Sequence, residues 1–126
     1  MGKIVGCSVV IKDDFNNILI VQKKVKRNEP KLWYLVGRTL RGKESTEKCI
    51  TRAVKDDLKV NIFDLQIIDE YKINDDENIL LYTGNVKESI NMGKDITSYK
   101  WIGIDNLNSY EFAEGEKERL LSCFNK

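Results

Sequence analysis

The sequence predicts an α/β fold, in which helices cover both faces of a mixed β-sheet. Three observations support this fold class. Short runs of β-branched residues recur along the chain, a central segment carries apolar residues at helical spacing, and a second amphipathic segment ends the chain. The length of 126 residues, 41% of them hydrophobic, fits one folded domain, and no repeat or Gly/Ser/Pro-rich linker divides it. We therefore expect a single domain over residues 1–126.

The N-terminal part predicts paired strands. The runs Ile4–Lys12 and Ile18–Lys24 are rich in β-branched residues and are separated by DDFNN, which predicts a β-hairpin with a five-residue loop. Val25–Lys31 holds the only proline, Pro30, and is expected to be a surface loop. The apolar run Leu32–Val36 follows, as a buried strand or a turn.

The central segment predicts a helix. A glycine-bounded loop, Gly37–Glu44, leads to Ser45, a residue type that caps helix N-termini well. Glu47 in the first turn suits the positive end of the helix dipole. The buried stripe is expected to be formed by residues four apart, namely Ile50, Val54 and Leu58.

The remaining elements complete the order of strand, strand, loop, helix, three strands and helix. Strands are expected near Leu65–Ile73, Ile79–Val86 and Tyr99–Ile104, with Asn74–Asn78 as a turn. The final helix is expected over Glu114–Phe124. This mixed order favours one sheet with a helix on each face.

The composition excludes several classes of function. Histidine is absent, which excludes His-dependent triads, Cys-His nucleophile pairs and zinc sites that use histidine. The three cysteines are odd in number and far apart, so a disulfide framework is not expected. A net charge of +1 argues against a globally basic nucleic-acid binder. No apolar run approaches the roughly 20 residues that span a bilayer, and no signal-peptide pattern is present. We therefore expect a cytoplasmic protein. We expect neither a membrane nor a specific nucleic acid as its partner.

Two neighbouring acids on the predicted central helix form a candidate metal site. At about 100° per residue, Asp56 and Asp57 flank Ala53 on one face, and Arg52 lies one turn before Asp56, within reach of it. Two carboxylates that point together repel each other unless a cation lies between them, and Mg²⁺ prefers carboxylate oxygen. The alternative is a solvated helix face whose acids are neutralised by nearby basic residues. The helix alone favours this alternative.

The segment before the helix is strongly basic. From residue 23 to residue 43, eight basic residues stand against Glu29 alone, namely Lys23, Lys24, Lys26, Arg27, Lys31, Arg38, Arg41 and Lys43. A basic loop beside an acidic helix is the arrangement expected for a polyphosphate bound through both cations and a metal ion. A charged surface hairpin that maintains solubility is the alternative, and charge alone favours it.

Taken together, these residues resemble the box motif of the Nudix hydrolase family. Glu44 is followed by seven residues and then Arg52, and four further positions fall in register, namely Val54, Asp56, Asp57 and Val60. The run Trp33-x-Leu35-x-Gly37 matches the aromatic-x-Leu-x-Gly segment that commonly precedes the family's loop, and Tyr99–Leu107 resembles its tryptophan-containing strand. The resemblance covers most of the chain. It implies a Nudix-type α/β/α sandwich and hydrolysis of a nucleoside diphosphate linked to another moiety, with Mg²⁺ or Mn²⁺ as cofactor.

The resemblance assigns roles to residues of this chain. Asp56 and Asp57 would bind the metal ion, and Glu44 and Arg52 would act in catalysis. Phosphate contacts with a small-molecule nucleotide or other diphosphate would come from basic residues of the loop, namely Lys23, Arg38, Arg41 and Lys43.

The box departs from the family pattern at five positions. Arg38 stands at the signature glycine, Ala53 at a glutamate, and Lys59 at a second glycine, while Asp56 and Asp57 replace two glutamates. Ala53 removes one anionic oxygen donor, and each shorter aspartate withdraws its carboxylate by about 1.5 Å from a metal that needs oxygens near 2.0–2.1 Å. Two hypotheses follow: a weakened Nudix pyrophosphohydrolase, or a catalytically impaired Nudix-fold module for nucleotide binding, regulation or protein interaction.

Overall fold

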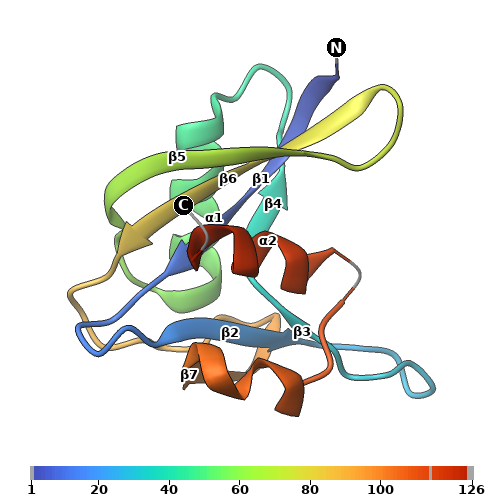
Figure 1. Ribbon diagram of the computed structural model, residues 1–126. Helices are drawn as coiled ribbons and strands as arrows, with labels where there is room; N and C mark the ends of the chain where they lie inside the picture. Colours follow the sequence, from blue (N-terminus) through green and yellow to red (C-terminus); the bar gives the residue numbers. More distant parts are fainter. Residues whose placement is uncertain (1, 114, 125–126) are drawn as a thin grey trace.

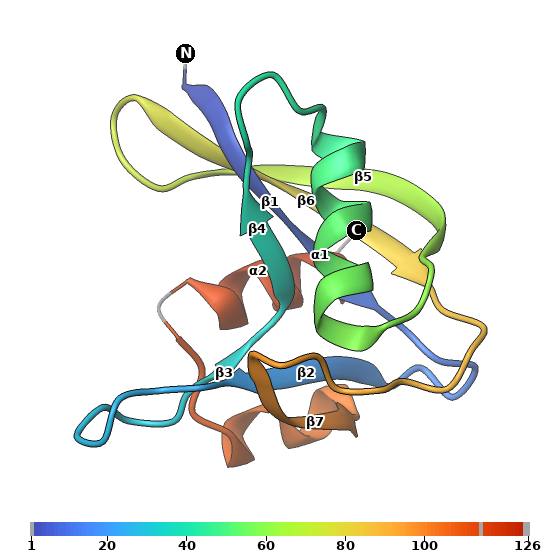
Figure 2. The same cartoon turned by 180° about the vertical axis from the view of Figure 1, so that it is seen from behind.

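The computed structural model, which describes residues 2–113 and 115–124, contains two β-sheets and two α-helices (Figure 1). The elements in chain order are β1 (Lys3–Ile11), β2 (Ile18–Lys23), β3 (Trp33–Tyr34), β4 (Val36–Thr39), α1 (Thr46–Leu58), β5 (Phe63–Lys72), β6 (Glu77–Asn85), β7 (Ile96–Ile102), the 3₁₀ helix η1 (Ile104–Ser109) and α2 (Glu116–Phe124). Figures 1 and 2, seen from opposite sides, place α1 and α2 on opposite faces of the larger sheet. The predicted α/β/α arrangement is therefore confirmed.

The larger sheet has the strand order β4-β1-β6-β5, and the smaller sheet has the order β3-β2-β7. β1 pairs with β6 in parallel, whereas its other neighbour, β4, is antiparallel, so the larger sheet is mixed, as predicted. The expected strands after the central helix are present as β5, β6 and β7, and β5 and β6 form a hairpin around the predicted turn. The helix expected over Glu114–Phe124 is observed from Glu116, while Glu114 lies outside the described residues.

The predicted hairpin between the first two strands is wrong. β1 and β2 belong to different sheets, and an isolated bridge between Lys12 and Ile18 lies where the chain passes from one to the other. Val10 and Ile20 are both 0% exposed, because each strand is enclosed on both faces by other elements. Continuous apolar runs of this kind indicate interior strands, and here each interior strand lies in its own sheet.

The run Leu32–Val36 links the two sheets. Tyr34 pairs with Val21 of β2, whereas Val36 pairs with Val9 of β1, so the chain leaves the smaller sheet and enters the larger one within two residues. Leu35 lies between them, is 1% exposed and packs in the apolar core. This crossing sets the position of Gly37 and Arg38 at the start of the box segment.

The central helix forms as its sequence predicts. The Ser45 hydroxyl caps α1 by accepting a hydrogen bond from the Lys48 backbone N–H at 3.2 Å. Ile50, Val54 and Leu58 are each fully buried, which confirms the predicted stripe. Among the described residues, no helix is both long enough and apolar enough to cross a bilayer.

Lys59 ends α1 in a left-handed conformation. Its φ is 59°, and its backbone N–H donates to the Lys55 carbonyl at 3.1 Å. A left-handed backbone costs a residue with a Cβ about 1–2 kcal/mol, and glycine is the residue most often found at this point of a helix. Lys59 therefore keeps the geometry of the glycine that the box pattern has here, at some cost in stability.

We predict that Lys59→Gly raises the free energy of unfolding by about 1 kcal/mol, because glycine adopts this conformation without steric strain. Urea denaturation of the natural chain and the variant measures the difference. Lys59→Ala is the matched control, since it removes the same side chain and keeps the Cβ. Equal stability of the glycine and alanine variants would contradict the explanation.

Candidate functional site

Arg38 and Asp57 form a two-pronged ion pair between β4 and α1. The Arg38 Nη1 donates to Asp57 Oδ2 at 2.9 Å, and Nη2 donates to Oδ1. Nη1 also donates to the Gly37 carbonyl at 2.9 Å. The Asp57 side chain is 1% exposed, whereas the Arg38 side chain is 23% exposed. The hydrogen bonds to Asp57 raise the pKa of Arg38 further above its ordinary value, so the guanidinium is charged.

Close backbone contacts hold both partners of this pair in place. A Cβ on Gly37 would come within 2.5 Å of the Cys7 carbonyl oxygen, so only glycine allows β4 to approach β1 here. On the helix side, the Gly93 N–H donates to the Asp57 carbonyl at 2.8 Å, and a Cβ on Gly93 would meet the Asp56 carbonyl oxygen at 2.0 Å. Figure 2 shows β4 beside α1, the arrangement that these contacts maintain.

Glu44 and Arg52 form a second ion pair. Arg52 Nε donates to Glu44 Oε2 at 2.9 Å, and Nη2 donates to Oε1 at 3.0 Å. Arg52 also donates to the Thr39 carbonyl at 3.2 Å, which fixes the loop against the helix. Hydrogen bonding to Arg52 lowers the pKa of Glu44 from 4.5 to about 2. The two predicted catalytic residues are thus brought together, and Arg52 bonds Glu44 rather than Asp56.

The two aspartates of the predicted metal site do not face a common point. Asp56 is exposed, whereas Asp57 is buried with both carboxylate oxygens bonded to Arg38. Ala53, at the place of a family glutamate, is 0% exposed and belongs to the apolar core. Both carboxylate oxygens of Glu44 accept hydrogen bonds from Arg52.

As they lie, these residues do not fit a divalent ion. Mg²⁺ needs several oxygens near 2.0–2.1 Å in octahedral geometry, and the oxygens of Asp57 already accept hydrogen bonds from a cation. In the part of the chain that the structure describes, no group of three or more His, Cys, Asp or Glu side chains could hold a metal ion. The metal role assigned to Asp56 and Asp57 stays a prediction that these contacts disfavour.

A cavity of about 260 Å³ gathers two of the four predicted phosphate contacts. Lys23 and Arg38 both line it, at the junction of β1, β4 and α2, but the Arg38 guanidinium is bonded to Asp57 of α1 on the opposite face of the sheet (Figures 1 and 2). Lys23 also lies over the Tyr34 ring, with its Nζ 4.6 Å from the ring centroid. Arg41 and Lys43 are exposed on the loop before α1 and do not line this cavity. Arg52 lines a separate hollow along the outer face of α1.

Two charged residues that sequence reasoning missed complete the cavity wall. Glu116 and Arg119 of α2 are 7% and 9% exposed, and their side chains pair at 3.2 Å. Burial raises the pKa of Glu116, against the opposing charges of Arg119 and Lys23. Among the described residues, Arg119 Nε makes no hydrogen bond, and Glu116 Oε2 has the ion-pair contact with Arg119 Nη2 without a well-aligned hydrogen bond. An acid and an arginine three residues apart on a helix usually form a surface pair, so the sequence carried no signal of their burial.

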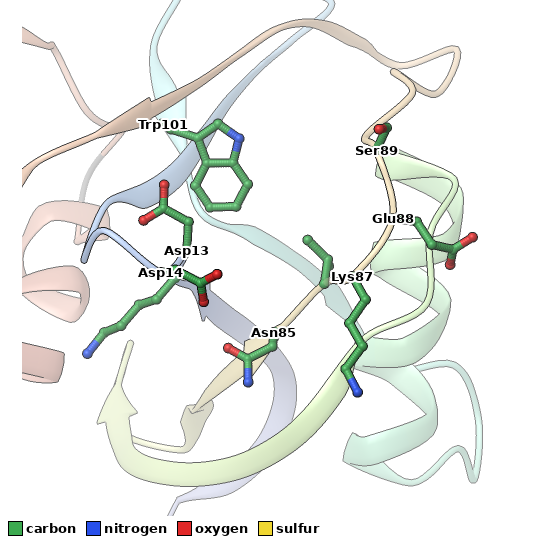
Figure 3. Close-up of a pocket in the computed structure, with 9 residues that line it drawn as sticks. Asp13, Asp14, Asn85, Lys87, Glu88, Ser89 and Trp101 are labelled. Carbon is green, nitrogen blue, oxygen red and sulfur yellow. The ribbon is translucent and has the colours of Figure 1, made fainter.

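A second hollow, of about 580 Å³, is lined by a different set of residues (Figure 3). It opens between the β1–β2 connection, with Asp13 and Asp14, and the segment after β6, with Lys87 and Glu88. The Trp101 ring forms part of its wall. None of the residues predicted to act in catalysis, metal binding or phosphate binding lines it.

Comparison with known proteins identifies the fold. No protein-family model matches the chain, and no curated protein matches its sequence. Many solved structures match it closely. A MutT structure from Aliivibrio salmonicida or Vibrio cholerae has a TM-score of 0.82 at 14% identity, covering 98% of each chain. A Nudix hydrolase from Nitrosomonas europaea gives 0.80 at 13% identity, covering 99% of this chain and 90% of the other.

A third structure, the Nudix domain of Shewanella oneidensis NrtR complexed with ADP ribose, gives a TM-score of 0.76 at 16% identity. The match covers 99% of this chain and 88% of that one. At such identities the likeness shows the fold. The chain has the Nudix fold, which confirms the sandwich predicted from the box residues and their neighbours.

We predict that Arg38→Ala lowers the free energy of unfolding by about 3–5 kcal/mol, because it leaves the buried Asp57 carboxylate without its partner. Urea denaturation measures the loss. Arg41→Ala, at an exposed arginine of the same loop, is the matched control and is expected to change stability by about 0.5 kcal/mol or less. Equal effects of the two substitutions would show that the ion pair is not buried in solution.

We also predict a pH-dependent contribution from Glu44. Its folded-state pKa of about 2 lies below the ordinary 4.5, so its stabilising effect is complete above pH 4.5 and is lost as the pH falls towards 2. Glu44→Gln and Arg52→Met, which each remove the pair, should therefore lose less stability over this pH range than the natural chain. Urea midpoints measured along the range test this. Parallel curves for all three proteins would contradict the assignment.

Proposed function

We propose that this chain is a Nudix-fold module that binds a nucleoside diphosphate derivative in the cavity between β4 and α2, with little or no turnover. The observation that carries this proposal is the Arg38–Asp57 pair, which occupies the carboxylate that metal-dependent hydrolysis would need. The binding alternative raised by the sequence is therefore favoured over the weakened hydrolase.

The charges of the cavity wall support a phosphate-bearing ligand. Lys23 and Arg119 bring two positive charges to it, against the single acid Glu116. Arginine and lysine are the side chains that most often contact phosphate, arginine with two parallel hydrogen bonds. A diphosphate placed among them would gain charge-assisted hydrogen bonds without a metal ion.

The rest of the ligand finds polar and aromatic partners in the same wall. Arg119 Nε, which makes no hydrogen bond among the described residues, offers a donor, and Glu116 Oε2, which lies 3.2 Å from Arg119 Nη2, offers an acceptor to a group that has both, such as the edge of a nucleobase. Tyr34 adds an aromatic surface. The cavity of about 260 Å³ is close to the lower end of the range of roughly 300–1,000 Å³ for small-molecule pockets, so part of the ligand would extend beyond it.

Slow hydrolysis is the second candidate, and the Glu44–Arg52 pair favours it. Both residues keep their places in the box, and Arg52 orients the ionised Glu44 carboxylate and lowers its pKa below its ordinary value. A carboxylate in that state can orient water or a metal ion. Restoring the missing glutamate as Ala53→Glu is a poor test, since residue 53 is 0% exposed and a glutamate there would bury a charge in the core.

Calorimetric titration with ADP-ribose and other nucleoside diphosphate derivatives tests binding. We predict that Lys23→Ala weakens the affinity by about tenfold, the loss of roughly 1.4 kcal/mol expected when a charge-assisted contact is removed. Lys26→Ala is the matched control, because Lys26 is exposed on the same basic segment outside the cavity. Equal affinities of the two variants would contradict the proposal that the ligand binds in this cavity.

Phosphate release from the same compounds, with Mg²⁺ and with Mn²⁺, separates the two candidate functions. We predict binding without measurable turnover by the natural chain. Rapid metal-dependent turnover would contradict the binding proposal and would establish the hydrolase. The assay uses the natural chain, so no loss of folding in a variant can obscure the result.

A further inference from the structure

The box position that is glycine in the Nudix pattern holds Arg38, and its side chain lies against the box acid Asp57. The pair uses both Asp57 oxygens and three hydrogen bonds of the guanidinium, one of which goes to the Gly37 carbonyl. A guanidinium presents five N–H donors in a rigid plane, so its capacity is not exhausted by these bonds. The Arg38 side chain is 23% exposed, so solvent reaches part of it.

A divalent ion at Asp57 would have to displace this guanidinium. Mg²⁺ requires direct contact with carboxylate oxygen at about 2.0–2.1 Å, and both Asp57 oxygens are already engaged. The displaced arginine would then remain beside a dication, because β4 is held against β1 by the close approach at Gly37. Repulsion between the two cations would oppose metal binding further.

The neighbouring acids cannot take over the site in this arrangement. Asp56 is exposed on the next helix position, and Glu44 is bonded through both oxygens to Arg52. Ala53 supplies no oxygen. A metal ion would therefore have only the Asp57 carboxylate, which is already bonded, and the solvated Asp56 carboxylate as ligands. The Arg38 guanidinium, in contrast, bonds both Asp57 oxygens and the Gly37 carbonyl.

We propose that Arg38 takes the place of the divalent cation in this chain: it neutralises Asp57 and places a fixed positive charge beside it, so that no divalent ion binds there. For ligand binding, this inference rests on the proposed function, and it specifies that a diphosphate ligand binds without a metal ion. One difference from the family pattern, Arg38 in place of a glycine, would then explain why ligand binding needs no metal ion.

The metal part of the inference is tested without any nucleotide. Electron paramagnetic resonance of Mn²⁺ titrated into the natural chain is expected to show only free ion, because no site competes with water for it. One Mn²⁺ bound per chain at micromolar concentration would overturn the proposal. This result does not depend on whether the chain binds nucleotides.

The ligand part uses ADP-ribose as the probe, titrated into the natural chain in EDTA and again in Mg²⁺. The expected affinities are equal in the two buffers, and a gain of about tenfold or more in Mg²⁺ would overturn the proposal. If ADP-ribose and the other nucleoside diphosphate derivatives bind in neither buffer, the proposed function fails, while the Mn²⁺ titration still decides the inference about Arg38.

Arg38→Gly, which restores the box glycine, tests whether the guanidinium occupies a cation's place. Asp57 is left without its partner, so Mn²⁺ is expected to raise the melting temperature of this variant and to leave that of Arg41→Gly unchanged. An equal Mn²⁺ effect on the natural chain, or none on folded Arg38→Gly, would overturn the proposal. If Arg38→Gly does not fold in EDTA, recovery of folding in Mn²⁺ supports it and failure to recover counts against it.

Discussion

A buried carboxylate near the end of a helix requires a positive partner, and Asp57 has one in Arg38 on the neighbouring strand. This pair connects β4 to α1, the two elements on which the box residues lie. Because Asp57 is 1% exposed, moving Arg38 away would leave an unpaired negative charge in the protein interior. Arg38 can therefore be replaced only by another cation, unless Asp57 itself loses its charge. The chemistry open to the site follows from this constraint.

The second pair, Glu44 with Arg52, holds the loop before α1 against the helix and leaves Asp56 alone in solvent. The acids of the box are therefore separated into two ion pairs and one solvated side chain, instead of being gathered around one ion. The positive charges of Lys23 and Arg119 lie on the opposite face of the larger sheet, in the cavity beside α2. Within the Nudix fold, this separation favours binding of an anion over metal-dependent hydrolysis of it.

Local signals predicted most of the elements, whereas contacts distant in sequence decided the rest. Ser45 and the stripe through Val54 specified α1, and β-branched runs located the strands. The hairpin prediction failed because nothing in the runs around Lys12 and Ile18 reveals that the strands belong to two sheets. The pairing of Arg38 with Asp57 spans 19 residues and depends on how β4 meets α1. Glu116 and Arg119 became cavity residues only through the packing of α2, so their burial was not predictable from spacing.

A double-mutant cycle on Arg38 and Asp57 tests the central claim most directly. The free energies of unfolding of the natural chain, Arg38→Met, Asp57→Asn and the double variant give the coupling between the two side chains. The buried pair described here predicts a coupling of about 2 kcal/mol or more, with the double variant more stable than the sum of the single effects implies. Additivity within about 0.5 kcal/mol would mean that the two side chains do not depend on each other, and would contradict the account.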